Sequence, residues 1–227
     1  MIFDRCWGPV GMLTFSFLTS LSSLSFAQPA TTTDRSATTA ITPDRIHKGF
    51  YFRGGLGVGY GGTKFTYEST TNEVTASGTG LGLDLWFGGT PVSGLAIGGA
   101  LHLQQTINPS LALNGRTVGN ASIRLNTVLI GPFADWFPDP RGGFHLGGTL
   151  GFAYLSLRDK NDDTVGRSPL GFGAAFFLGY DWWVSKEWSL GITGRLMGAS
   201  VSEDQNNGSN VKALSYHPAL LFSVLYY

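Results

Sequence analysis

The sequence is short of cysteine, charge and long apolar runs, and each shortage excludes a kind of protein. Cys6 is the only cysteine of the 227 residues, so the chain cannot form an internal disulfide or a thiolate metal centre. Charged residues make up 13% of the chain, against about 25% in ordinary soluble domains. After residue 28, no stretch holds the roughly 18 consecutive apolar residues that a spanning helix needs. Low charge without such a helix is unusual for a soluble protein and fits a membrane β-barrel, whose outer face is apolar at alternate residues.

The amino-terminal segment is typical of a secretory signal peptide. Arg5 precedes an apolar run from Gly11 to Phe26, and Ser25 and Ala27 are small residues at the two positions that signal peptidase reads. We therefore predict that residues 1–27 are a signal peptide and that cleavage also removes the cysteine. An amino-terminal membrane anchor is the alternative, but the run is short and interrupted by serines and threonines.

Two further features concern the exported chain. Residues 28–48 are rich in threonine, alanine and proline without apolar periodicity, which predicts a flexible leader. The whole chain has 15 basic and 15 acidic residues, and loss of the signal peptide removes one of each. A net charge of zero gives no reason to expect a nucleic-acid partner.

From residue 50 onward, apolar residues alternate with small or polar residues, the period of two that is typical of strands with two different faces. We predict eight strands, at residues 50–60, 80–89, 94–104, 124–137, 143–155, 170–184, 188–201 and 216–227. The connections alternate strictly between long (61–79, 105–123, 156–169, 202–215) and short (90–93, 138–142, 185–187).

A transmembrane barrel requires this rhythm, because its periplasmic turns are short and its extracellular loops are long. The pattern therefore predicts an all-β fold: an eight-stranded antiparallel up-and-down transmembrane β-barrel that spans residues 49–227. Ten strands remain the alternative if residues 64–78 also pair within the membrane.

Alternation places seven ionisable residues on the inner side of these strands, opposite the bulky apolar ones. They are Arg53, Asp84, His102, Asp135, His145, Asp181 and Arg195. The side of Asp135 is ambiguous, because Phe133 and Leu129 share it. Counted from the turns, Arg53 with Asp84 and Asp135 with His145 lie at similar depth, so we predict two interior pairs. Such pairs either gate a narrow pore or fill a plugged interior, and the small width of an eight-stranded barrel favours the plug.

Tryptophans and the two terminal tyrosines gather near the predicted short turns. Indole rings prefer the membrane–water boundary, since one edge is apolar and the N–H needs a polar partner. We predict a periplasmic aromatic belt of Trp86, Trp136, Trp182, Trp183, Trp188, Tyr226 and Tyr227. Because Ser223 shares a side with Tyr227, Tyr226 is the better candidate to face lipid.

Few residues suggest a catalytic or ligand-binding role. Ser215 and His217 lie two apart on one side of the last strand, but a nucleophile and base also need an orienting carboxylate and access to substrate. The glycines of Gly55–Gly59 alternate within a strand that no helix follows, unlike a dinucleotide-binding loop. The acidic segment Asp159–Asp163 lacks the ligand spacing of a calcium loop. We predict no catalytic residue, no cofactor and no metal.

The signal peptide, the strand rhythm and the block Gly131–Pro140 before a glycine-rich strand resemble the small outer-membrane β-barrel proteins of Gram-negative bacteria, which include OmpA-, OmpX- and OmpW-like barrels. The resemblance covers about residues 49–227. It implies a non-enzymatic monomer that barrel-assembly machinery inserts among outer-membrane lipids and lipopolysaccharide. It further implies a role in envelope integrity or surface interaction, with a narrow channel for small hydrophobic molecules as the alternative and a lipid-modifying enzyme as a third hypothesis.

Overall fold

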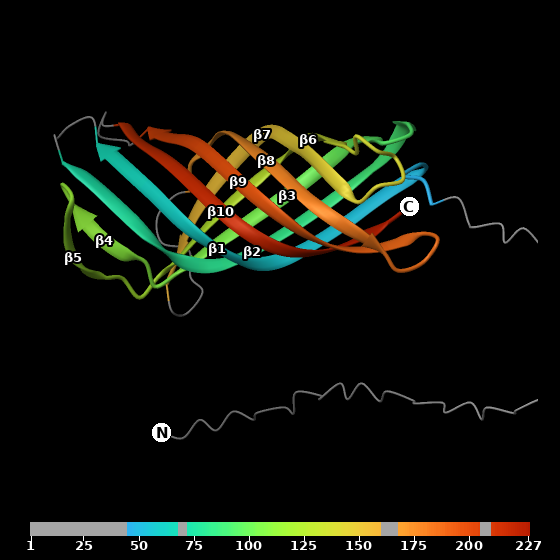
Figure 1. Cartoon of the computed structure of the whole chain (residues 1–227). Helices are drawn as coiled ribbons and strands as arrows, with labels where there is room; N and C mark the ends of the chain where they lie inside the picture. Colours follow the sequence, from blue (N-terminus) through green and yellow to red (C-terminus); the bar gives the residue numbers. More distant parts are fainter. Residues whose placement is uncertain (1–44, 68–71, 160–167, 205–209) are drawn as a thin grey trace, which may run out of the picture. The chain divides into compact units, whose positions relative to one another are not determined.

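The computed structural model describes residues 45–67, 72–159, 168–204 and 210–227, and the predicted signal peptide and most of the predicted leader lie outside these ranges. Regular structure in the described residues is β-strand (Figure 1). Within these ranges, no helix has the length and apolar character needed to cross a membrane.

The described residues form ten strands, and eight of them make a closed antiparallel ring. The strands are β1 (Phe50–Tyr67), β2 (Glu73–Val92), β3 (Leu95–Ile107), β4 (Ser110–Leu113), β5 (Arg116–Asn120), β6 (Arg124–Trp136), β7 (Phe144–Arg158), β8 (Leu170–Trp183), β9 (Trp188–Asp204) and β10 (Asn210–Tyr226). The ring runs in the order β1-β10-β9-β8-β7-β6-β3-β2 and closes because β1 also pairs with β2. Closure leaves the barrel wall without a free edge strand.

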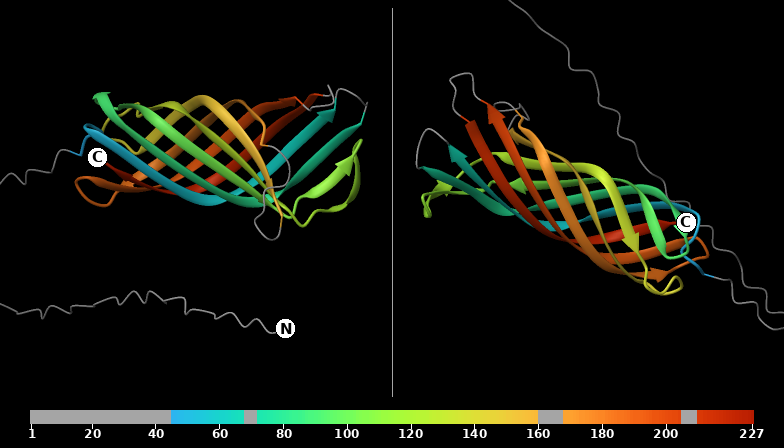
Figure 2. Two further views of the ribbon diagram at one scale, coloured as in Figure 1. Left: turned by 180° about the vertical axis from the view of Figure 1, so that it is seen from behind. Right: turned by 90° about the horizontal axis from the view of Figure 1, so that it is seen from above.

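The strands are steeply inclined to the barrel axis, as both views of Figure 2 show. Cross-strand partners followed from Gly54 around the ring return to β1 at Lys64, ten residues further along the strand. A shift of this size gives a tilt of roughly 40°. Residues at equal height on neighbouring strands are therefore offset by about 1.25 residues from their hydrogen-bonded register.

The β2–β3, β6–β7 and β8–β9 connections lie at one end of the barrel, here called the turn end. The opposite end is here called the loop end. Here the structure corrects the predicted loops 61–79 and 202–215, because β1, β2, β9 and β10 extend through most of these residues. Alternation of side chains continues there, so pairing continues as well.

The two additional strands, β4 and β5, form a hairpin outside the ring at the loop end (Figure 1). β4 pairs with Val74–Ser77 of β2, above the part of β2 that pairs with β3. Asn114 and Gly115 have φ angles of 49° and 80°, the left-handed values of a type I′ turn. Within the described residues the sheet thus contains ten strands, while the barrel keeps the eight that the sequence predicts, and residues 64–67 and 73–78 lengthen β1 and β2.

The core lies inside the ring. Buried apolar residues cluster toward the turn end (Tyr51, Trp86, Ala96, Ala100, Phe133, Phe137, Phe177, Leu221, Leu225), at mid-height (Leu129, Ala175, Met197) and toward the loop end (Leu125, Ala153, Leu155, Ala199, Val201, Ala213). Large apolar side chains on the other face of every barrel strand are exposed, including Leu56, Leu150, Phe172 and Phe222 at 56–71%. The molecule therefore has an apolar exterior as well as an interior core.

A closed ring predicts resistance to unfolding by detergent. Folded protein in sodium dodecyl sulfate at room temperature is expected to migrate differently from boiled protein, because every barrel strand is hydrogen-bonded on both sides. A variant that ends at Asp204 lacks β10, cannot close the ring, and should migrate identically before and after boiling. Equal migration of the intact protein in both states would contradict the closed barrel.

Candidate functional site in the barrel interior

The structure places all seven predicted ionisable residues inside the barrel. Arg53, Asp84, His102, Asp135 and His145 are fully buried, and Asp181 and Arg195 are at most 3% exposed. The ambiguity at β6 is resolved, since Phe133 and Leu129 are buried on the same face as Asp135. The seven residues form two separate clusters at different heights.

Arg53 is the centre of the cluster nearer the turn end. Its Nη2 donates to Asp181 Oδ2 at 2.5 Å and lies 3.4 Å from Asp135 Oδ2. Its Nε donates to the Tyr51 hydroxyl at 2.8 Å, and that hydroxyl donates to Asp135 Oδ2 at 2.6 Å. Two carboxylates and one phenol thus surround a single guanidinium.

His145 links the same groups. Its Nδ1 donates to Asp135 Oδ1 at 2.9 Å, while Arg53 Nη1 donates to its Nε2 at 2.8 Å. This network fits a neutral imidazole with its proton on Nδ1, because Nε2 must accept from the guanidinium. The predicted pair Asp135–His145 is present in the structure.

The predicted pair Arg53–Asp84 is wrong. Arg53 lies opposite Trp86 in the β1–β2 ladder, and Asp84 lies opposite Gly55. In a tilted narrow barrel, an inward side chain meets groups of equal height across the lumen, and those groups are on other strands. The predicted pair came from counting residues from a turn, and such a count takes no account of the tilt of the strands.

Asp84 instead pairs with Arg195 in the second cluster, nearer the loop end. Arg195 Nη1 donates to Asp84 Oδ1, and Arg195 Nη2 donates to Gln104 Oε1 at 2.8 Å. His102 Nδ1 lies 3.2 Å from Asp84 Oδ2, and its Nε2 shares a hydrogen bond of 2.9 Å with Thr149 Oγ1. Each arginine is therefore matched by at least one buried carboxylate.

An aromatic layer separates the two clusters and includes a residue that we expected elsewhere. Trp86 was predicted in the aromatic belt, but it is fully buried inside the barrel. Its ring makes edge contacts with His102 (5.3 Å) and Phe177 (5.6 Å), and the Arg53 guanidinium lies 6.0 Å from its centre. Nearness to a short turn does not determine which face a residue occupies, and alternation with Asp84 places Trp86 inside.

The other belt residues divide into two groups. Trp136, Trp182 and Trp188 are 43–51% exposed on the outer face, and Tyr226 joins them there through its contact with Trp188. Trp183 and Tyr227 have the opposite orientation. They pack across the turn end, with ring centres 5.8 Å apart.

His47 completes this closure of the turn end. Its imidazole is fully buried and stacks on Phe137 at 3.8 Å and Trp183 at 4.6 Å. Its Nε2 donates to Gly142 O at 2.7 Å, and the Gly94 amide donates to its carbonyl at 3.1 Å. The predicted flexible leader is thus wrong at its end, where these contacts fix His47 over the mouth.

Sequence reasoning missed several residues that make the clusters possible. Tyr51 could have been found, because it shares the inner side of β1 with Arg53. Gly179 and Gly191 could not have been found, since their role is to leave space for side chains of neighbouring strands. A Cβ at Gly179 would collide with His145 Nε2, and one at Gly191 would collide with Asp181 Oδ1.

Ser215 and His217 lie on the inner face of β10, at 5% and 0% exposure. Ser215 donates to Ala199 O at 3.4 Å. In the described part of the chain, no hydrogen bond joins Ser215 to His217 and no carboxylate orients the imidazole. Nor do the described residues contain a group of three or more side chains suited to hold a metal ion. The pair lacks the geometry of a nucleophile and its base.

The strand pairing and the two faces define a class: closed eight-stranded antiparallel barrels with an apolar outside and an ion-paired inside. No protein-family model matches the sequence, and no curated protein matches it. Among solved structures, the chain resembles small outer-membrane barrels.

Three of these structures illustrate the likeness. The outer membrane protein OprG from Pseudomonas aeruginosa has a TM-score of 0.48 at 12% identity, covering 81% of this chain and 99% of its own. The outer membrane protein AlkL has 0.47 at 14%, covering 89% and 96%, and Neisserial surface protein A has 0.44 at 15%, covering 78% and 96%. The architecture rests on the observed strand pairing.

Removal of the Arg53 guanidinium should destabilise the fold strongly. Replacing it with methionine keeps most of the volume but leaves Asp135 and Asp181 buried without their cation, which typically costs about 3–5 kcal/mol. Urea unfolding of the barrel in vesicles measures the change. Adding Asp181→Asn should recover part of the loss, and Arg45→Met, at an exposed position, should have little effect. Unchanged unfolding of Arg53→Met would contradict the assigned network.

The His47 closure should open in acid. Burial lowers the pKa of His47 from 6.5 to about 4, against the raising effect of its hydrogen bond to Gly142. Between these values the released imidazole binds a proton that the packed one does not, so closure is complete above pH 6.5 and is lost as the pH falls toward 4. Exchange of the Gly94 amide, followed by nuclear magnetic resonance, should accelerate over this range.

His47→Phe is the matched control, because phenylalanine can stack on Phe137 but does not titrate. Its Gly94 amide should exchange without this pH dependence once the intrinsic pH effect on exchange is subtracted. The same pH profile in both proteins would refute the role of the imidazole.

Proposed function

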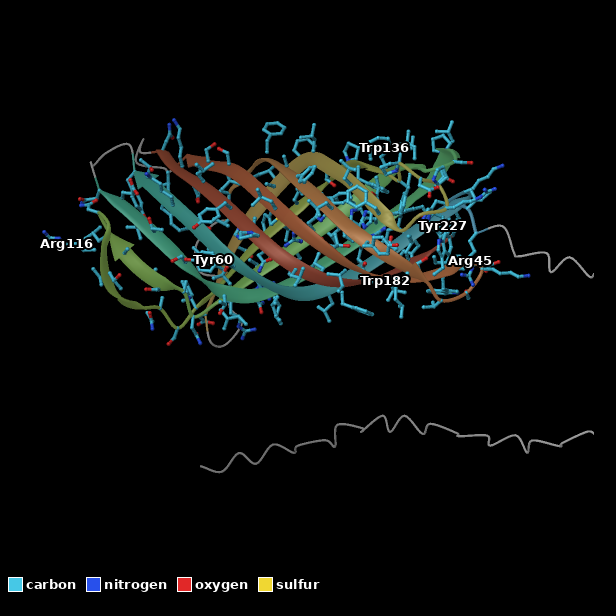
Figure 3. All side chains as sticks on the ribbon, in the orientation of Figure 1. Arg45, Tyr60, Arg116, Trp136, Trp182 and Tyr227 are labelled. Carbon is cyan, nitrogen blue, oxygen red and sulfur yellow. The ribbon has the colours of Figure 1, made fainter. Side chains whose placement is uncertain are left out.

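We propose that this protein is a non-enzymatic outer-membrane β-barrel whose interior is sealed and whose role is structural or interactive through its loop end. The observation that carries the proposal is an apolar band around the outside of the barrel. Figure 3 labels three of the aromatic residues that border this band, Trp136 and Trp182 near the turn end and Tyr60 toward the loop end.

Aromatic residues border the band on both sides. Outward tyrosines at similar height form a girdle toward the loop end: Tyr60, Tyr154 and Tyr216. Outward aromatic residues form the second girdle at the turn end: Trp136, Trp182, Trp188 and Tyr226. About ten residues of strand separate the girdles, which at 3.3 Å per residue and a tilt of roughly 40° is about 25 Å. That height matches the apolar band of outer-membrane barrels.

The outer face between the girdles contains no charged side chain in the described strands. The charges of these segments point inward, where they form the ion pairs of the two clusters. A water-soluble barrel would have the reverse arrangement, because solvent would face the outside. This distribution supports insertion in a bilayer, with the turn end periplasmic and the loop end extracellular.

The packed interior supports a sealed barrel. From the turn end, the lumen contains the His47 closure, the Arg53 cluster, the layer around Trp86 and the Arg195 cluster in succession. Eight strands leave an interior just wide enough for side chains. The two arginine clusters therefore act as structural ion pairs that fill the barrel.

A carrier of small hydrophobic molecules is the second candidate function. In its favour, the interior toward the loop end contains an apolar cluster of Leu125, Leu155, Val201 and small alanines, beside buried polar residues such as Thr63 and Thr127. Such a surface suits a hydrophobic guest that enters from the loop end. The sealed turn end argues against passage straight through the barrel.

Planar-bilayer recordings separate these functions. The reconstituted protein should insert without steady ion conductance, because the layers from His47 to Arg195 block the lumen. Flotation of the protein with vesicles, and the gel shift of the same sample, control for insertion and folding. Stable unitary currents that Arg53→Ala alters would contradict the sealed interior and support a gate. Silent bilayers combined with uptake of a small aromatic hydrocarbon into vesicles would favour the carrier.

A further inference from the structure

Four basic residues project outward at one height near the loop end. Lys64 of β1, Arg124 of β6, Arg158 of β7 and Lys212 of β10 lie on the outer face, since their neighbours Thr63, Leu125, Leu157 and Ala213 face the interior. Corrected for the tilt of the strands, the four positions differ by little more than one residue in height.

The four residues form two pairs. Arg124 and Arg158 are direct cross-strand partners on β6 and β7. Lys64 pairs with Leu214 and Lys212 pairs with Thr66, so the two lysines are diagonal neighbours on β1 and β10. In the ring order, the β1–β10 seam lies opposite the β6–β7 seam. The barrel thus has two cationic pairs on opposite sides.

Like charges on facing positions of a ladder are destabilising unless something anionic compensates them. Glu73 is near the lysine pair and forms an ion pair of 2.6 Å with Lys64. Asp159 directly follows Arg158 in sequence. Arg124, Arg158 and Lys212 also interact with other residues of the chain. The two arginines are in register on β6 and β7.

The height of the pairs indicates what faces them. They lie about four residues of strand beyond the tyrosine girdle of Tyr60, Tyr154 and Tyr216, or roughly 10 Å along the barrel axis. Tyrosines of a girdle lie at the boundary between hydrocarbon and headgroups. Basic side chains just beyond that boundary are level with lipid headgroups, where anionic lipids attract lysine and arginine.

We propose that the Arg124–Arg158 pair and the Lys64–Lys212 pair each bind the phosphate of an anionic lipid headgroup in the leaflet at the loop end. Arginine in particular presents a planar fork that matches phosphate oxygens. The inference rests on the proposed membrane insertion. It adds a lipid class and two defined sites to an otherwise uniform outer surface.

Native mass spectrometry of the detergent-solubilised full-length protein tests the two sites. With lipid A, a glycolipid that has two phosphates, the folded barrel is expected to retain up to two molecules, and with phosphatidylcholine none under the same activation. Arg124→Gln with Arg158→Gln should remove one retained lipid A, and Lys64→Gln with Lys212→Gln the other. Apparent affinity at each altered pair should fall on the order of tenfold or more.

Matched variants identify the cause. Arg124→Lys with Arg158→Lys keeps the charges and should retain lipid A. Arg45→Gln with Lys186→Gln removes two charges at the turn end and should change nothing. Displacement of lipid A by millimolar inorganic phosphate would reveal an adventitious anion site and would overturn the proposal.

Failure of this inference and failure of the proposed function give different results. If the barrel shows its gel shift and floats with vesicles, yet retains lipid A and phosphatidylcholine equally, the headgroup sites are refuted while membrane insertion stands. If flotation fails for every variant, the membrane assignment itself is refuted. Retention of both lipid A molecules by the fourfold glutamine variant would also refute the sites.

Discussion

Closure of eight strands with a shift of ten residues is the constraint on which the rest of this structure depends. It makes the lumen so narrow that inward side chains must touch one another. It also tilts the strands, so that the groups which meet inside come from distant parts of the chain. Arg53 on β1 reaches Asp135 on β6 and Asp181 on β8 for this reason. Ion pairing across the lumen is a consequence of ring geometry.

The local pattern of the sequence was sufficient for most of the architecture. Alternation in residues 50–227 predicted the eight barrel strands, and it assigned the inward face of Arg53, Asp181 and the other buried charges. Alternation with Asp84 also places Trp86 inside, and the belt assignment of Trp86 was wrong because it followed nearness to a turn instead. Alternation could not predict the position of His47, since a single residue before the first strand has no periodic pattern.

The partners inside the barrel could not be predicted in the same way. Which carboxylate meets which arginine depends on the register shift, a property of the whole ring that no single strand encodes. The positions Gly179 and Gly191 illustrate the same limit. Each makes room for a group of a neighbouring strand, so their importance becomes visible only when the neighbours are known.

Polarity is distributed so that each surface suits its surroundings. The inside combines costly charges with complementary ones, and the outside presents hydrocarbon between two aromatic girdles. Because a buried pair contributes little net stability compared with apolar packing, the clusters are better understood as fixing the cross-section of the barrel. Two arginines at two heights hold opposite walls together.

The contact between His47 and Tyr227 has a consequence for the order in which the barrel forms. The two rings are 4.8 Å apart, yet they come from the two ends of the folded chain, on either side of the β1–β10 seam. Contact between His47 and Tyr227 closes a loop that includes all the strands. Contacts of such sequence separation form late because closing a long loop costs much conformational entropy. Hairpins between successive strands can assemble first, and the β1–β10 seam joins afterwards. Packing of the two aromatic rings can then stabilise the closed seam, and a chain that lacks β10 stays open along one side.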